Sequence, residues 1–329
     1  MNTRRRFVIV LGASALAAAC PSSAQQTRKT PVVGVLHPGL PPPGSGSAVV
    51  NALEQGLRDS GYVVGQNIAV EFRWGGGRPE ALPGLALELV KLKVDVLYII
   101  SPAAIRAARA VAGTLPIIAT DLESDPVASG LVASLAKPGG NLTGLFLDFP
   151  AITGKWLEML TETVPGVRRA AVLWDTTTNE SQLSTITAAA KKLSIALDVA
   201  RFQQLAEIET VLHAALKKRP QALVQLSSPL VNGAADRIAS FTQANRLPSI
   251  SMFTSFPENG GLMSFGPNLP VLYRRIVPLI DKILKGTKPG DIPIERPTIF
   301  ELVVNMKTAK ALGLKVPNSI LVRADKVIE

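Results

Sequence analysis

The segment Ala136–Asp148, AKPGGNLTGLFLD, divides the chain into two parts that share one pattern. Residues 138–141 are the turn formers Pro-Gly-Gly-Asn, and the apolar run 142–147 predicts a short buried strand. Four strand-then-helix units precede this segment. The same alternation begins again after it, with a helix at about Gly154. We therefore predict that the chain leaves one α/β lobe here and enters a second one.

Length and composition are consistent with two lobes. The chain has 329 residues, 47% of them hydrophobic and 18% charged, which is typical of a globular protein with more than one core. The expected fold class is α/β, with two doubly wound parallel-sheet lobes joined by three crossovers. Turn-rich stretches at 258–267 and 286–297 predict the second and third crossovers. The expected lobes are residues 31–145 with 268–293, and residues 146–267 with 294–329.

Two local expectations concern the C-terminal part. Pro278 lies inside the apolar stripe of a helix predicted over 273–284, so it should kink that helix or mark its true start. Residues 324–326 are expected to form a tail.

The N-terminus predicts export. Residues 2–6 carry three arginines, and the apolar run 7–19 is too short to span a bilayer but suits a signal peptide. We expect a signal peptide over residues 1–24 that directs the chain to the periplasm by the twin-arginine or the general secretory route. Cleavage before Cys20, which would produce a lipoprotein, is the alternative to cleavage after Ala24.

Charge and motifs exclude several classes of function. The net charge of +10 is scattered without a basic block, so nucleic-acid binding is not supported. A single cysteine excludes disulfides within the chain and structural zinc of the multi-cysteine type. Gly44-x-Gly46 lacks the third glycine of a dinucleotide fingerprint, so no cofactor is expected. Neither His37 nor His213 has a metal-ligand partner at i+4, so no metal is expected either.

The candidate ligand site consists of loops at the carboxyl ends of predicted strands, where open α/β sheets bind ligands. Ser101-Pro102 opens a helix after the strand 94–100, and Ser227-Ser228-Pro229 repeats this arrangement in the second half. Amides at such helix starts, with Ser101 and Ser227, are expected to hold a carboxylate. The candidate ligand-binding residues are His37, Ser101, Pro102, Ala103, Thr120, Asp121 and Glu123 in the first half, and Asp175, Thr176, Asn179, Ser227, Ser228, Phe253 and Thr254 in the second.

The acidic loop after the fourth strand allows two interpretations. Asp121 or Glu123 pairs with a ligand amine or hydroxyl, or the loop only supplies Asp125 as a helix cap. No catalytic residue is proposed, because the chain has neither a G-x-S-x-G elbow nor a phosphate-binding loop. An exported hydrolase that uses the acidic loop remains an alternative, as does a ligand-sensing module for a membrane sensor.

Four stretches of the chain resemble a known family. They are 121–144 (DLESDPVASGLVASLAKPGGNLTG), 155–165 (KWLEMLTETVP), 260–293 and 297–329, and they are similar to the tryptophan/tyrosine-type substrate-binding proteins of ABC transporters. The resemblance implies the type I periplasmic-binding fold, closure around a small ligand, and delivery to a permease with its ATPase. The implied ligand is an amino acid or an aromatic or organic acid. Pro278 and the loop 40–46 depart from the family pattern.

Overall fold

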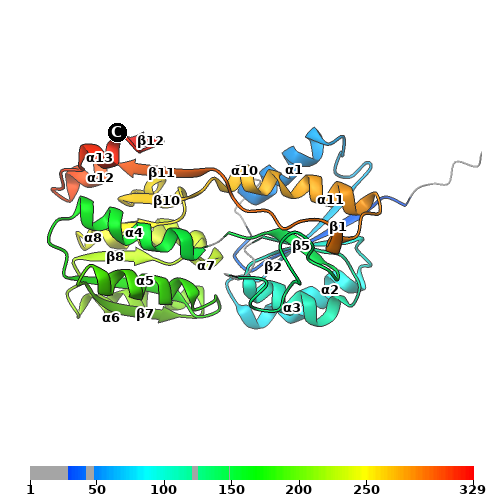
Figure 1. Ribbon diagram of the computed structural model, residues 1–329, viewed down its shortest axis with the longest axis horizontal. Coiled ribbons are helices and arrows are strands. Elements are labelled where there is room, and N and C mark those ends of the chain that lie inside the picture. Colours follow the sequence, from blue (N-terminus) through cyan, green and yellow to red (C-terminus); the bar gives the residue numbers. More distant parts are fainter. Residues whose placement is uncertain (1–28, 42–47, 121–124, 148) are drawn as a thin grey trace, which may run out of the picture.

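Two lobes lie side by side along the long axis of the molecule, each built around its own sheet (Figure 1). The structure is a computed structural model that describes residues 29–41, 48–120, 125–147 and 149–329. The expected signal peptide and Cys20 lie outside these residues. Both sheets are mostly parallel, so the predicted fold class is confirmed.

The first sheet has the strand order β2-β1-β3-β4-β5, and all of its pairs are parallel. Helices α2 and α3 cover one face, and α1, α10 and α11 cover the other (Figure 1). The strands are β1 (Val32–His37), β2 (Ala69–Trp74), β3 (Val96–Ile100), β4 (Ile117–Thr120) and β5 (Leu142–Leu145). The helices are α1 (Ala48–Asp59), η1 (Pro79–Ala81), α2 (Leu82–Lys91), α3 (Pro102–Ala112), α10 (Leu269–Arg274), α11 (Ile276–Leu284) and η3 (Pro289–Asp291).

The second sheet has the order β12-β11-β10-β9-β8-β6-β7, and only β10 and β11 pair antiparallel. Its strands are β6 (Arg169–Asp175), β7 (Ala196–Phe202), β8 (Ala222–Gln225), β9 (Ser249–Ser251), β10 (Met263–Pro267), β11 (Phe300–Asn305) and β12 (Lys326–Ile328). Its helices are α4 (Phe149–Thr163), α5 (Ser181–Lys192), η2 (Leu205–Glu207), α6 (Ile208–Leu216), α7 (Pro229–Gly233), α8 (Ala235–Ala244), α9 (Ser255–Glu258), α12 (Met306–Ala311) and α13 (Asn318–Leu321).

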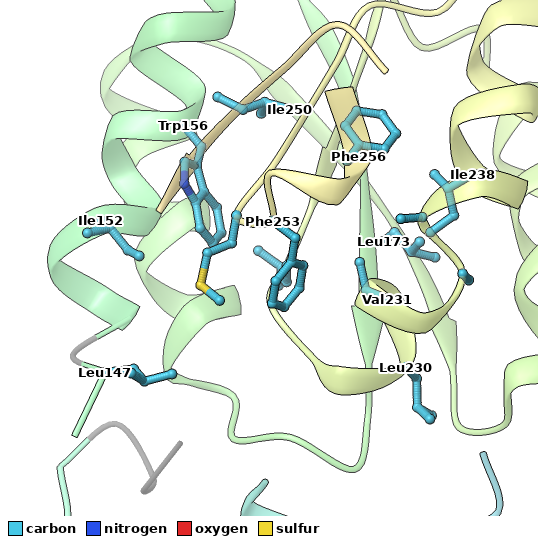
Figure 2. Close-up of a cluster of buried hydrophobic side chains, with 14 of the residues drawn as sticks. Leu147, Ile152, Trp156, Leu173, Leu230, Val231, Ile238, Ile250, Phe253 and Phe256 are labelled. Carbon is cyan, nitrogen blue, oxygen red and sulfur yellow. The ribbon is translucent and has the colours of Figure 1, made fainter. Parts of the chain in front are cut away.

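Period-2 alternation divides the core of the second lobe between the two faces of its sheet. Ile250 meets the fully buried Trp156 of α4 on one face, and Leu173 meets Val231 and Ile238 on the other (Figure 2). The Trp156 indole N–H also donates to the carbonyl of Phe265 at 2.7 Å. That bond ties α4 to β10.

The strand β5, which follows the turn at 138–141, packs directly against the third crossover. The Thr143 hydroxyl donates to the carbonyl of Ile292 at 2.8 Å, and the Glu295 N–H donates to the carbonyl of Gly144 at 3.0 Å. Gly144 has a φ of +148°, and a Cβ there would lie 1.9 Å from the carbonyl oxygen of Ala119 on the adjacent strand. Only glycine therefore lets β4 and β5 pair so closely next to the crossover.

Several local predictions were wrong. The tail expected over 324–326 instead leads into β12, which begins at Lys326 and pairs in parallel with β11. Helix α4 begins at Phe149 instead of Gly154, and turns over 126–130 stand where a fourth helix would follow β4. The second expectation for Pro278, that it marks the true start of a helix, is confirmed: α10 ends at Arg274, and Pro278 lies in the first turn of α11, where a proline is tolerated. In the part of the chain that the structure describes, no helix has the length and apolarity needed to cross a membrane.

Candidate functional site

Two pockets lie where the carboxyl ends of both sheets meet between the lobes. We call the first the His37 pocket and the second the Ser101 pocket, and their free volumes are about 30 and 10 Å³ respectively. The His37 pocket is lined by His37, Ile100, Thr120, Leu147, Ser227, Pro229, Asn232, Met252, Phe253, Leu269 and Tyr273. The Ser101 pocket is lined by Pro38, Gly77, Pro79, Leu82, Ser101, Pro102, Ala103, Asp175, Thr177, Thr178, Pro229 and Leu230. Both lobes contribute to each pocket.

The His37 pocket is apolar with a few neutral hydrogen-bonding groups, as ligand pockets generally are. The hydroxyls of Tyr98 and Thr120 bond to each other at 3.1 Å, and burial raises the pKa of Tyr98 well above its usual value. Burial also lowers the pKa of His37 to about 4, so its imidazole is neutral near pH 7. None of the described lining residues of this pocket is Asp, Glu, Lys or Arg.

The Ser101 pocket is bounded by the start of α3. Ser101 has a φ of +89°, which is rare for a residue other than glycine, and its hydroxyl accepts the N–H of Ala104 at 3.4 Å. Pro102 has no N–H, and the N–H of Ile105 donates to the carbonyl of Ser101 at 3.0 Å. The N–H of Ala103 is therefore the amide that this helix start offers to a ligand.

Asp175 adds a carboxylate to the wall of the Ser101 pocket, but its own loop already uses that group. The backbone N–H and the hydroxyl of Thr177 donate to one carboxylate oxygen at 2.9 and 2.7 Å. Desolvation by burial raises the pKa of Asp175, and the hydrogen bonds from Thr177 and Ser228 oppose that shift. This carboxylate thus organises the loop after β6.

The serine pair after β8 is only partly arranged as expected. Ser228, not Ser227, is the residue that matches Ser101, because its hydroxyl accepts the N–H of Val231 at 3.1 Å and caps α7. The backbone N–H and C=O of Ser227 are both bonded to the side chain of Gln182, at 2.8 and 3.0 Å. The Ser227 amide is therefore taken and does not hold a ligand carboxylate; only its side chain remains in the pocket wall.

The remaining predicted residues do not line either pocket or lie outside the described residues. The hydroxyl of Thr176 donates to the carbonyl of Phe202, and the side-chain oxygen of Asn179 accepts the N–H of Ser181 at 2.7 Å. Neither residue, nor Thr254, lines the two pockets. Asp121 and Glu123 lie outside the described residues. The Asp125 carboxylate accepts two backbone N–H groups of a turn and caps no helix.

Sequence reasoning missed several lining residues because they resemble core. Leu147, Leu230 and Phe253 lie along the edge of the second lobe's core that faces the first lobe, and of these only Phe253 was predicted (Figure 2). Leu269 and Tyr273 belong to α10, directly after the second crossover. These lining residues could have been predicted from their apolar character and their position close to a crossover, since crossovers border the gap between the lobes.

Two contacts join the lobes across the rims of the pockets. The guanidinium of Arg106 on α3 donates to the carbonyl of Thr177 in the second lobe at 2.8 Å. Gly77, after β2, lies so close to η2 that a Cβ on it would be 2.8 Å from the Cβ of Leu205. The structure therefore shows the lobes closed on each other.

Comparisons with known proteins agree with this geometry. The chain is 28% identical to a tyrosine-binding protein of Clostridioides difficile over 79% of this chain and 74% of that protein. A conserved domain protein of Vibrio cholerae superposes with a TM-score of 0.83 at 26% identity, covering 91% of this chain and 100% of that one. A Streptococcus pneumoniae ABC domain in complex with L-Trp gives 0.82 at 24% identity, with the same coverage.

The family comparison extends over nearly the whole described chain. The model of a family described as ABC transporter substrate binding protein matches residues 36–328, which include every strand after β1 and every described residue that lines the two pockets. The chain belongs to the ABC transporter substrate-binding protein family.

Proposed function

We propose that this chain captures an aromatic amino acid or a related organic acid between its lobes and presents it to an ABC permease with its ATPase. The observation that carries the proposal is the pair of pockets between the lobes, each walled by both sheets. The Ser101 pocket offers the N–H of Ala103 to a carboxylate, and the His37 pocket offers apolar walls to a ring. The tyrosine-binding relative supports the same ligand class.

The ligand would stabilise the closed arrangement because it touches both lobes at once. A ligand shifts an equilibrium between two states only by its difference in affinity for them. In the open state the wall formed by His37 and Thr120 would separate from the wall formed by Phe253 and Asn232. A bound ring would then keep its contacts with only one of the two walls, and the transporter would recognise the closed shape.

The lobe bounds and the location of the protein belong to the same proposal. We take residues 31–145 with 268–293 as one lobe and 146–267 with 294–329 as the other. Export to the periplasm, by a signal peptide over residues 1–24, would place the receptor beside its permease. It would touch the membrane only by docking there, or by a lipid on Cys20. Asp121 or Glu123 would pair with the ligand amine, and no metal or cofactor is needed.

A thermal-shift screen over amino acids, aromatic acids and small organic acids tests the ligand class. A ligand at 100 times its dissociation constant should add about 2.7 kcal/mol to the free energy of unfolding. Isothermal titration of each hit should give one site per chain. The variant Asp121→Asn should bind an amino-acid hit more weakly, with no turnover of the hit by either protein. A panel without any stabilising aromatic acid, or turnover of a hit, would refute the proposal.

A further inference from the structure

The imidazole of His37 is held in one orientation at the end of β1. Its Nδ1 accepts the N–H of Gly39 at 3.0 Å, and its ring packs on the indole of Trp74 with centroids 4.8 Å apart. The carbonyl of His37 accepts the N–H of Gly75 at 2.8 Å. The strand end, the following loop and the neighbouring strand thus fix both the backbone and the ring.

This arrangement determines which ring nitrogen carries the hydrogen. Since Nδ1 accepts a hydrogen bond, it has no hydrogen of its own. Burial holds the imidazole neutral near pH 7, because it lowers the pKa of His37 to about 4. The single ring hydrogen is therefore on Nε2. His37 is partly exposed and lines its pocket, and no described residue forms a hydrogen bond with Nε2.

Several other polar groups of the His37 pocket already have partners among the described residues. Thr120 shares a hydrogen bond with Tyr98, and the side-chain oxygen of Asn232 accepts the hydroxyl of Ser255 at 2.8 Å. The backbone of Ser227 is bonded to Gln182. The rest of the wall is apolar, including Ile100, Leu147, Met252, Phe253 and Leu269. A ring in this pocket would thus meet the oriented N–H donor of His37 in largely apolar surroundings.

We propose that the Nε2–H of His37 donates to an oxygen carried on the ligand's ring, so that this receptor selects aromatic acids with a ring hydroxyl or carbonyl. The inference rests on the proposed function and assigns a specificity-determining role to His37. A phenyl ring offers no acceptor, and an indole N–H is itself a donor. Either ring would cover the Nε2–H and leave it without a partner, and sites built around a hydrogen bond reject such ligands strongly.

The test compares ligand pairs that differ by one ring oxygen. Isothermal titration is done with L-tyrosine against L-phenylalanine, and with 4-hydroxyphenylacetate against phenylacetate. We expect the wild-type chain to prefer the hydroxylated member by roughly ten- to a hundredfold. His37→Leu should reduce that ratio to near one. His37→Gln, whose amide N–H₂ can reach the same place, should keep most of it.

The two hypotheses fail in different ways. If no aromatic acid binds the wild-type chain, the proposed function is wrong and the role of His37 falls with it. If both members of each pair bind equally, or His37→Leu keeps the ratio, the proposed function stands and the role of His37 is refuted.

A spectroscopic measurement on the wild-type chain avoids any folding defect of the variants. The chain has only two histidines, so ¹⁵N spectra of their rings are simple to assign in the untagged protein. We expect the Nε2–H form for His37, with an Nε2 shift that moves on adding the hydroxylated ligand. His213 provides the reference, since its Nδ1 lies 2.8 Å from the carbonyl of Glu209 on an exposed helix face. An Nδ1–H form of His37 would overturn the proposal.

Discussion

Replacing Gly77 with alanine should hold the two lobes apart while each lobe keeps its own fold. A Cβ at this position would lie 2.8 Å from the Cβ and 3.4 Å from the Cδ2 of Leu205, in the opposite lobe. A change of rotamer cannot relieve the first contact, because the Cβ of Leu205 is fixed to its backbone. The two segments must separate by about 0.6 Å or more to reach an ordinary van der Waals distance.

The expected cost follows from where the conflict arises. Overpacking of this kind typically costs about 1–3 kcal/mol. Only the closed state contains the contact, so the whole cost opposes closure. Ligand affinity should therefore fall roughly 5- to 150-fold. The strain of alanine at a φ of +73° is present in the open and the closed state alike, so it lowers stability but cancels in the affinity.

Gly76 provides the matched control. It lies in the same loop at a φ of +66°, but a Cβ there would approach only the guanidinium Nε of Arg78, at 3.8 Å. Gly76→Ala should lose as much stability as Gly77→Ala and keep its affinity for whichever aromatic acid binds best. Leu205→Gly in the Gly77→Ala background should restore affinity. Equal affinities of the two alanine variants, by isothermal titration, would refute the reasoning.

Two further substitutions and one pH profile test the fold. Gly144→Ala should lower the free energy of unfolding in urea by at least about 3 kcal/mol, because its Cβ would lie 1.9 Å from the backbone oxygen of Ala119. A loss below about 1 kcal/mol, which is on the order of the experimental error, would contradict this expectation. Trp156→Phe removes the donor to the carbonyl of Phe265 and should cost about 1–3 kcal/mol by the same measurement. Between pH 4 and 6.5 the unfolded chain binds a proton on His37 that the folded chain does not, so stability should rise with pH through this window and level off above it. His37 should contribute at most about 3.4 kcal/mol to the free energy of unfolding, and the partial exposure of its ring makes the contribution smaller than that. His37→Gln should remove this contribution from the pH profile.

Elements with a strong local signal were predicted well from sequence. The run 96–100 is fully buried in the structure, and its apolar composition alone indicated a central strand. Ser101-Pro102 begins a helix as its residue types require. Strand β12 was missed because it lies at the edge of the sheet, where Lys326 and Val327 are exposed and no apolar alternation marks the pairing. A three-residue edge strand depends on its partner more than on its own composition.

The site, too, was predicted only in part from the sequence. Sequence located the strand ends that form the pockets, since a parallel sheet brings them to one edge. It did not show which groups are already paired. The side chain of Gln182 forms hydrogen bonds with the backbone N–H and C=O of Ser227, which lies 45 residues further along the chain. No pattern within either segment indicates these bonds.

The contacts between the lobes matter for function, and they too join segments that are distant in the sequence. Gly77 and Leu205 belong to different lobes, as do Arg106 and Thr177, and the sequence around each residue alone indicates only an ordinary surface position. Their contacts exist only when the lobes are closed. A receptor that signals by closing must keep this state a few kcal/mol from the open one, so that ligand binding decides between them. Small residues and one exposed hydrogen bond suit that balance, since a larger apolar contact would close the lobes without ligand and a bulkier loop would prevent closure.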